Sequence, residues 1–475
     1  MITFSICLIL LVTAYFTYAR YLERLAGVDP SKPTPCQRLY DGVDYVSLPR
    51  WRIFLIQLLN IAGTGPIFGA ILGACFGPVA FVWITLGGIF MGAMHDFLSG
   101  MMIMHHDGQS LPEVVGHYLG GGVRQFMRVF SVVLMVLVGA VFIVSPAQLL
   151  GSMAPSVSVK IWVAVILVYY FIATMLPIDK IIGKIYPVFG VALIAMAVGL
   201  LGALVFGHHS VPELTTLRNM QPNAHALPII PTLFITIACG AISGFHATQS
   251  PLMARCVGNE RECRGVFYGA MISESIIALI WAAAAMAFFG GAPQLAAALG
   301  LHEGSAAWAV DTISSNMLGT VGGILALLGV VAAPITSGDT AFRSARLIVA
   351  DMLHIEQRSK LKRLWICLPL FAIGFAITLI DFDVIWRYFA WSNQTLSVIT
   401  LWAITVYLYR RRVNIWVAAL PAVMMTYICS SFVFVSGQFL GMENRTLAYI
   451  LGGVVTLAIA CLMLSKLHRD RPVSA

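Results

Sequence analysis

The stretch Asn60-Ile-Ala-Gly-Thr-Gly-Pro66 interrupts an apolar segment at a depth where a membrane helix would be expected to continue. A second stretch, Gly240-Ala-Ile-Ser-Gly-Phe-His-Ala-Thr-Gln-Ser-Pro251, interrupts another apolar segment much later in the chain. Unwound backbone inside a bilayer is tolerated only where protein or a water-filled cavity satisfies its polar groups. Matching interruptions in two halves of a chain are typical of the binding site of a secondary transporter.

The composition places the rest of the chain in the membrane as well. Hydrophobic residues make up 59% of the 475 residues, charged residues only 11%, and the mean hydropathy is +0.88. A soluble domain carries about 25% charged residues, so we expect an all-α polytopic membrane protein. About thirteen transmembrane helices are predicted, at residues 2–19, 53–75, 78–104, 129–151, 161–176, 188–206, 229–250, 266–289, 318–338, 364–380, 386–408, 415–435 and 447–464.

The basic residues predict the orientation. With the N-terminus outside, most of the 29 lysines and arginines fall in segments on the cytoplasmic side. Only Lys160, Arg218, Arg387 and Arg445 fall outside. This distribution follows the positive-inside rule, and it places the C-terminus in the cytoplasm. The net charge of +8 is therefore a topology signal and gives no reason to expect nucleic acid as a partner.

The two interrupted spans are predicted to run in opposite directions, because they are the second and the seventh. This relation favours an inverted 5+5 repeat. The predicted organisation is an accessory helix, two repeats and two further accessory helices, at residues 1–19, 53–206, 229–408 and 415–464. Glycine also serves close helix packing in membranes, and Gly69-x-x-x-Gly73 is better interpreted as a packing face than as a site.

Ionisable residues inside the predicted spans are candidates for function, because a charge near the bilayer centre costs at least about 2.5 kcal/mol. Asp96, Glu274, His95 and His246 qualify, and the two histidines are predicted to lie at similar depth. Histidine can relay a proton near neutral pH. Two alternatives stay open: His95 and Asp96 form ordinary hydrogen bonds between helices, or the two histidines are axial ligands of a haem.

The ninth predicted span ends in Ala333-Pro-Ile-Thr-Ser-Gly-Asp-Thr340. Oxygen atoms of Thr336, Ser337 and Asp339 suit a hard cation such as sodium. Ser337 or Asp339 capping a following helix is the favoured alternative. The segment Trp391-Ser-Asn-Gln-Thr395 brings further polar residues to membrane depth, where they must face protein or water.

The nine cysteines are interpreted as structural, since no C-x-x-C spacing of a metal or redox site occurs. We expect no metal site and no cofactor. The apolar run before Arg20 and Arg24 is predicted to be an uncleaved anchor, because its positive charges follow it.

Long motifs resemble those of the carbon starvation protein A family. They are Asp41-Gly-Val-Asp-Tyr45, Ala62-Gly-Thr-Gly-Pro-Ile67, His95-Asp-Phe-Leu-Ser-Gly100, Ser243-Gly-Phe-His-Ala-Thr-Gln-Ser-Pro-Leu-Met-Ala-Arg255, Pro334-Ile-Thr-Ser-Gly-Asp-Thr-Ala-Phe-Arg-Ser-Ala-Arg346 and Trp386-Arg-Tyr-Phe-Ala-Trp-Ser-Asn-Gln-Thr395. The chain resembles a short form of the family. The resemblance implies an inner-membrane protein of the amino acid–polyamine–organocation superfamily with a leucine-transporter-like fold. It also implies nutrient uptake in the carbon starvation response, with pyruvate imported by proton symport in some relatives and peptides in others.

These observations predict a secondary active transporter, not an enzyme, that imports a small carboxylate and is driven by protons. Half-helix N-termini suit a carboxylate. The predicted substrate site consists of Gly63, Thr64, Gly65, Ser243, Gly244, His246 and Gln249. The predicted coupling residues are His95, Asp96, Glu274, Thr336, Ser337 and Asp339. Peptide as the substrate, sodium as the coupling ion and a sensor that binds without transport remain alternatives, and the sequence predicts no oligomeric state.

Overall fold

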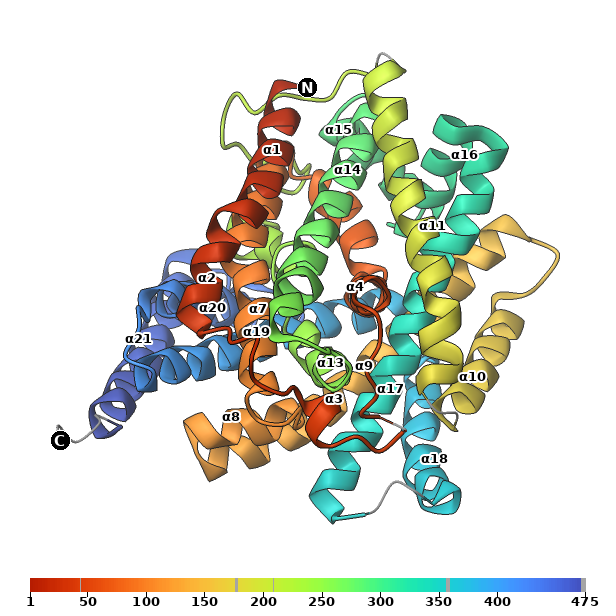
Figure 1. Cartoon of the computed structure of the whole chain (residues 1–475). Helices are drawn as coiled ribbons and strands as arrows, with labels where there is room; N and C mark the ends of the chain where they lie inside the picture. The colour runs from red at the N-terminus through yellow and green to blue at the C-terminus, as the bar shows by residue number, and fades with distance from the viewer. Residues whose placement is uncertain (43, 176–177, 208, 356–358, 471–475) are drawn as a thin grey trace.

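A computed structural model describes residues 1–42, 44–175, 178–207, 209–355 and 359–470 (Figure 1). Every regular element in these ranges is a helix, which confirms the predicted all-α class. The predicted end of the fifth span, residue 176, lies outside the described residues.

Each predicted span overlaps one helical segment, and the bounds differ most for the ninth, predicted at 318–338, where the helical segment runs from Ala306 to Leu353. In the first half these segments are α1 (Ile2–Phe16) with α2 (Tyr18–Ala26), α4 (Arg50–Ile61) with η1 (Gly65–Gly69) and α5 (Ala70–Ala74), α6 (Val79–Val82) with η2 (Trp83–Ala93) and α7 (Met94–Met104), α9 (Gly121–Met153), α10 (Val159–Met175) and α11 (Ile178–Phe206). The short helices α3 (Pro35–Arg38) and α8 (Leu111–Leu119) lie in the connections.

The second half has the same character. Its segments are η3 (Ile229–Leu233) with α12 (Phe234–Thr236) and α13 (Gly244–Ala254), η4 (Glu260–Glu262) and η5 (Arg264–Gly269) with α14 (Ala270–Phe289), α16 (Ala306–Leu325) with η6 (Ala326–Val331) and α17 (Ala332–Leu353), α18 (Lys360–Ile377), α19 (Phe382–Arg410), α20 (Trp416–Val435) and α21 (Arg445–Arg469). The connecting helix α15 (Ala292–Leu301) was not predicted.

Length and hydropathy bear out the membrane assignment in part. Within the described ranges, eight helices are long and apolar enough to cross a membrane, or nine if α4 and the bent η1–α5 segment form one span. The total of thirteen, the domain limits and the inverted repeat stay predictions.

The outer faces of the peripheral helices are apolar. Figure 1 shows α7, α13 and α14 inside the bundle and α10, α16 and α21 at its periphery. On α10, Ile161, Val165, Val168 and Ile172 are exposed at helical spacing, and Leu457 and Leu464 are exposed on α21. In a soluble protein such faces would be a liability, whereas lipid covers them in a bilayer. In contrast, the ionisable residues His95, Asp96, His246 and Glu274 are fully buried in the interior of the bundle.

Both predicted interruptions are present. The axis bends by 57° between α4 and the η1–α5 segment. In the second interruption, α12 ends at Thr236 and α13 begins only at Gly244. Gly240 within it has a φ of +91°, a conformation that favours glycine, and a Cβ there would lie 2.6 Å from the Cβ of Ala278.

Gly69 and Gly73 form a packing face, as the sequence indicated. A Cβ on Gly69 would lie 2.9 Å from the carbonyl oxygen of Thr236, and a Cβ on Gly73 would lie 2.2 Å from Cγ1 of Ile237. The two interrupted helices therefore pack against each other, with glycines of the first against the backbone and side chains of the second.

The start of α1 and the connection before η3 lie on one side of the molecule. The carboxylate of Glu213 accepts hydrogen bonds from the backbone N–H groups of Ile2 (2.7 Å) and Thr3 (2.8 Å). The amino group of Met1 also contacts this carboxylate. These contacts satisfy donors that every helix leaves free at its N-terminus, and they agree with the predicted relative topology.

Candidate functional site

The two interruptions meet at Gly65 and Cys239. A Cβ on Gly65 would lie 2.3 Å from the Cβ and 2.4 Å from the Sγ of Cys239. No side chain larger than hydrogen fits at residue 65 unless Cys239 moves. Glycine at this position therefore allows the unwound backbone of the two helices to come together in the buried interior.

Carbonyl groups freed by the interruptions have hydrogen-bond partners. The hydroxyl of Ser337 on α17 donates to the carbonyl of Leu59 at 2.7 Å. The indole of Trp83 donates to the carbonyl of Ile237 at 3.0 Å, and the amide of Gln394 donates to that of Phe234 at 3.2 Å. These bonds meet the requirement that unwound backbone in a membrane be satisfied by protein.

Three of the predicted ionisable residues form one hydrogen-bonded unit. His95 and Asp96 lie in the first turn of α7, and His246 lies in α13. The carboxylate of Asp96 bonds Nδ1 of His95 through Oδ1 and Nδ1 of His246 through Oδ2, each at 2.8 Å. All three side chains are fully buried. Asp96 therefore fixes both imidazole rings and joins α7 to α13.

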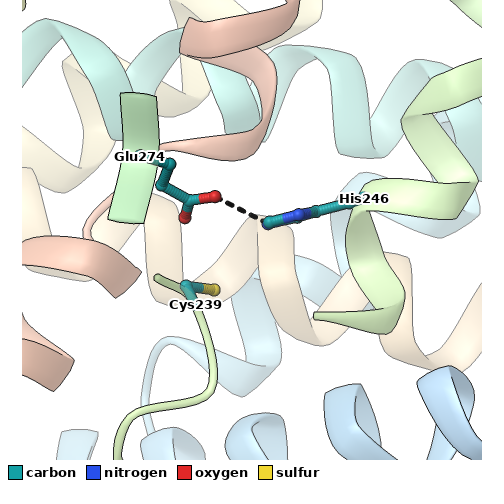
Figure 2. Close-up of side chains that lie close together, drawn as sticks. All are labelled: Cys239, His246 and Glu274. Carbon is teal, nitrogen blue, oxygen red and sulfur yellow. Dashed lines mark ion pairs between the residues drawn. The ribbon is translucent and has the colours of Figure 1, made fainter. Parts of the chain in front are cut away.

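Glu274 faces the other side of the His246 ring. Figure 2 shows His246, Glu274 and Cys239 turned toward one another from α13, from α14 and from the unwound segment before α13. Oε2 of Glu274 lies 3.4 Å from Nε2 of His246. This distance is longer than an ordinary hydrogen bond. The sulfur, nitrogen and carboxylate ligand atoms of these three residues all lie within 4.8 Å of one another, so they could hold a metal ion.

Small residues on η2 allow this assembly. A Cβ on Gly92 would lie 2.3 Å from the carbonyl oxygen of Ala241, and a Cβ on Gly88 would lie 2.4 Å from Oγ of Ser275. The helix that carries Asp96 can therefore lie directly against the second interruption and against α14.

The N-terminus of α13 is occupied by a side chain of α19. Oδ1 of Asn393 accepts a hydrogen bond from the backbone N–H of Phe245 at 2.7 Å and another from the hydroxyl of Ser243 at 3.1 Å. A Cβ on Gly244 would lie 2.5 Å from the carbonyl oxygen of Asn393. Ser243 and Gly244 thus lie at the N-terminus of α13, where the neutral amide of Asn393 accepts the hydrogen bonds, and their role in substrate binding stays a prediction.

Gln249 and His246 contact different partners. Nε2 of Gln249 donates to the hydroxyl of Thr248 at 3.0 Å and lies 3.7 Å from the sulfur of Met135 on α9. His246 instead points to Asp96 and Glu274. The predicted role of Gln249 in substrate binding stays a prediction.

Thr336, Ser337 and Asp339 lie inside α17, so the favoured interpretation of helix capping is wrong. The helix runs from Ala332 to Leu353 without ending at Pro334 or Gly338. The helix continues from the π-helical turn η6 into α17 and passes through Pro334, which removes one backbone hydrogen bond without ending the helix. A Cβ on Gly338 would lie 2.1 Å from the hydroxyl oxygen of Tyr170, so this glycine serves close packing. Asp339 accepts a 2.7 Å hydrogen bond from the hydroxyl of Tyr186.

Gln57 and Asn60 were not predicted as site residues, although Asn60 begins the quoted interruption. Both are fully buried on α4. Neither side-chain amide, nor the hydroxyl of Thr64, has a hydrogen-bond partner among the described residues. A buried amide without partners is unfavourable. Gln57 and Asn60 are three residues apart, which puts them on one face of α4, and that spacing was the signal available in the sequence.

A cavity of about 560 Å³ approaches the interruptions from the side of Gln221. Its lining includes Leu72 on α5, Thr236 on α12, and Trp386 and Arg387 on α19. His246 and Asp96 do not line it. In this conformation the ionisable cluster is separated from the cavity by the packed interruptions.

The cluster geometry does not favour the haem alternative. Axial ligands of one haem lie on opposite faces of the iron. Here Nδ1 of His95 and Nδ1 of His246 are bonded to a single carboxylate, so Asp96 occupies the space between the rings.

Solved structures with the same fold are transporters. The structure of MhsT in complex with L-phenylalanine covers 89% of this chain and 99% of its own, with a TM-score of 0.56 and 13% identity. A point mutant of the manganese transporter of Eremococcus coleocola gives a TM-score of 0.51 at 12% identity over 91% of this chain and 99% of its own. The chain therefore has a leucine-transporter-like fold.

The profile of the family described as "Carbon starvation protein CstA" matches residues 1–159 and 146–320. The chain belongs to this family, which confirms the resemblance. An uncharacterized membrane protein of Haemophilus influenzae is 42% identical over 61% of this chain and 91% of its own length. The peptide transporter CstA and the pyruvate/proton symporter BtsT of Escherichia coli are each 26% identical, over 58% and 57% of this chain. The matches span 48% and 46% of those two relatives, or about half their length.

Proposed function

We propose that this protein is a secondary active transporter that imports a small nutrient with a carboxylate group, by proton symport, across the inner membrane during carbon starvation. The observation that carries the proposal is the contact of the two interrupted helices at Gly65 and Cys239. Paired half-helices at mid-membrane are where transporters of this fold class bind their substrates.

A carboxylate is the chemical group shared by the candidate substrates. Relatives carry the names peptide transporter and pyruvate/proton symporter, and pyruvate and peptides both have a carboxylate. The N-terminus of α13 offers backbone N–H groups and a partial positive charge. In this structure Oδ1 of Asn393 accepts a hydrogen bond from the backbone N–H of Phe245. A bound substrate would put its carboxylate oxygen in the place of this amide oxygen.

The unpartnered polar groups of α4 support a second contact region. Gln57, Asn60 and Thr64 lie beside the first interruption and lack hydrogen-bond partners within the described part of the chain. A polar substrate, or the water that accompanies it, would satisfy them. Gln57 and Asn60 would thus add residues of α4 to the predicted substrate-binding residues Gly63, Thr64 and Gly65, which follow this helix.

Proton coupling is supported by the name of the BtsT relative and by the position of the buried cluster. Asp96 and His246 connect α7, in the predicted first repeat, with α13, in the predicted second. A change of charge at this junction would act on both repeats at once. The predicted coupling role of His95, Asp96 and Glu274 rests on this connection.

Uptake into proteoliposomes tests the proposal. The purified protein is reconstituted, and labelled pyruvate and a labelled dipeptide are offered with an imposed pH gradient, an imposed sodium gradient or neither. Accumulation of one compound that follows the pH gradient is expected. Binding without accumulation would identify a sensor instead, and uptake that follows sodium and ignores pH would overturn proton coupling and favour Thr336 and Ser337 as ion ligands.

A further inference from the structure

Cys239, His246 and Glu274 combine three ligand types that the transport proposal does not explain together. They supply sulfur, nitrogen and oxygen from three separate segments, and all three side chains are buried (Figure 2). Their ligand atoms lie within 4.8 Å of one another. Convergence of such atoms in a membrane interior is costly unless they have a partner.

The nitrogen and oxygen ligand atoms of this cluster have no hydrogen bonds to described residues, whereas the sulfur of Cys239 makes two long contacts of 3.7 Å, to Oγ of Ser243 and from Nδ2 of Asn393. Nε2 of His246 and both carboxylate oxygens of Glu274 have no hydrogen-bond partner in the described ranges of the chain. The N–H of Gly240 lies toward Glu274 but does not complete a hydrogen bond. Thus Nε2 of His246 and the carboxylate of Glu274, which point into the cluster, are unsatisfied, whereas Nδ1 of His246, which points away from it, is bonded to Asp96.

The spacing of these atoms fits a bound cation better than a direct contact. Nε2 of His246 and Oε2 of Glu274 are 3.4 Å apart. Two ligand atoms held about 2.1 Å from a tetrahedral metal ion lie about 3.4 Å from each other. The sulfur of Cys239 lies within 4.8 Å of both atoms and would be the third ligand of such an ion.

The surroundings of His246 are those of a metal ligand. Histidines that bind metal through one nitrogen usually donate the N–H of the other to a carboxylate, which fixes the ring and its tautomer. Asp96 accepts this bond from His246 at 2.8 Å, and His95 holds the second oxygen of Asp96. This arrangement directs the lone pair of His246 Nε2 toward Glu274 and Cys239.

We propose that Cys239, His246 and Glu274 form a binding site for one divalent transition-metal ion of the zinc class. A thiolate with imidazole and carboxylate selects a borderline-soft ion over magnesium or calcium. Binding replaces the thiol S–H bond of Cys239 by a bond from sulfur to the metal, and the released proton passes to solvent. Three protein ligands leave a fourth position for water or another small ligand. This proposal departs from the expectation of no metal site and of nine structural cysteines, and the experiment below decides between them.

A metal at this site would fix the unwound segment of the second interruption. Cys239 lies in that segment, directly against Gly65, while His246 and Glu274 lie on α13 and α14. The ion would tie the segment to both helices. Metal binding at this site can be measured without any transport assay, so the test does not require the substrate to be known.

The test is metal binding by the purified full-length protein in detergent. After equilibration with zinc and removal of the excess, we expect about one zinc per chain by elemental analysis. Cobalt in place of zinc should give a sulfur-to-cobalt charge-transfer band. Cys239→Ser should abolish the band, and Glu274→Gln should weaken zinc binding more than the 10–100-fold typical of losing an outer hydrogen bond to a ligand.

Cys429→Ser is the matched control, because Cys429 is also buried but lies on α20, away from the cluster. It should bind metal like the wild type. Monodisperse elution and unchanged unfolding temperature without metal establish that each variant is folded. Equal zinc content and an equal cobalt spectrum for the wild type and Cys239→Ser would overturn the site, whatever the outcome of the uptake assay.

Discussion

The carboxylate of Asp96 and the imidazole of His246, which are 150 positions apart in the chain, share a 2.8 Å hydrogen bond in the buried interior. The bond joins the helix that begins beside η2 to the half-helix after the second interruption. An acid and a histidine held together at this junction connect the ionisable residues with the unwound backbone.

Asp96→Asn should remove gradient-driven accumulation while leaving some exchange of substrate. The carboxamide has nearly the same size, but it carries no charge, and its single oxygen cannot accept from both His95 and His246 as the carboxylate does. We expect accumulation under a pH gradient to fall more than about tenfold, which corresponds to 1.4 kcal/mol. Exchange needs no net movement of protons and is measured with labelled substrate on both sides.

Glu443→Gln is the control for that variant, since Glu443 is an exposed acid outside the cluster. It should accumulate substrate normally. Normal accumulation by Asp96→Asn itself would show that Asp96 is structural, and Glu274 would then be the next residue to replace.

Gly65→Ala should greatly reduce uptake without preventing membrane insertion. The added methyl would lie 2.3 Å from the Cβ of Cys239, so the two interruptions would have to separate. Overpacking of this kind costs about 1–3 kcal/mol, which predicts a loss of uptake of roughly tenfold or more. Gly202→Ala is the matched control, because a Cβ there has nothing within 4 Å. Uptake by Gly65→Ala equal to that of the control would mean that the contact is dispensable.

The sequence predicted the helical class and both interruptions because clustered glycine, proline and polar residues seldom occur in an unbroken membrane helix. It also singled out His95, Asp96, His246 and Glu274. It did not show that they touch, since hydropathy places a residue only by depth and gives no rotation about the helix axis. Asp96 could therefore be predicted to be buried, but its bond to His246 could not.

The errors have physical reasons too. Helix capping was expected at Ser337 because Pro334 and Gly338 usually mark helix ends. The proline lies directly after the π-helical turn η6, within a helix that continues through it, and the glycine packs against Tyr170, so neither ends the helix. The metal site that we propose could not be anticipated from the sequence, because His246 and Glu274 lie seven and 35 positions after Cys239, outside the short spacings that sequence motifs describe.

The orientation of the termini is tested with reporter fusions. Alkaline phosphatase is active only outside the cytoplasm, so a fusion after residue 475 should be inactive. A fusion after Met220 should be active, because that segment is on the side of the start of α1. An active fusion after residue 475 would contradict the odd number of spans.

Glu213 should make stability depend on pH in the acid range. Its pKa is lowered from 4.5 to about 2, because the carboxylate bonds to the amino terminus and to the side chain and N–H of Thr3. A lowered pKa in the folded protein means that the contribution to stability is complete above about 4.5 and is lost as the pH falls toward 2. The unfolding temperature of Glu213→Gln should therefore lie below that of the wild type at pH 7, and the difference should shrink between these two values. A difference independent of pH would exclude the charge as its cause.

Asn60 and Asn393 should respond in opposite ways to replacement by alanine. Both are fully buried amides beside an interruption, but only Asn393 has partners, the N–H of Phe245 and the hydroxyl of Ser243. Asn393→Ala leaves a buried donor unsatisfied and should lower the free energy of unfolding by about 1–3 kcal/mol. Asn60→Ala removes an amide that bonds to none of the described residues, so stability should be unchanged or higher.

If Asn60 contacts the substrate, its variant should nevertheless show a higher KM for uptake. Thermal unfolding and uptake measured on the same preparations separate the two effects, and a stable Asn60→Ala protein with unchanged KM would remove α4 from the proposed substrate site.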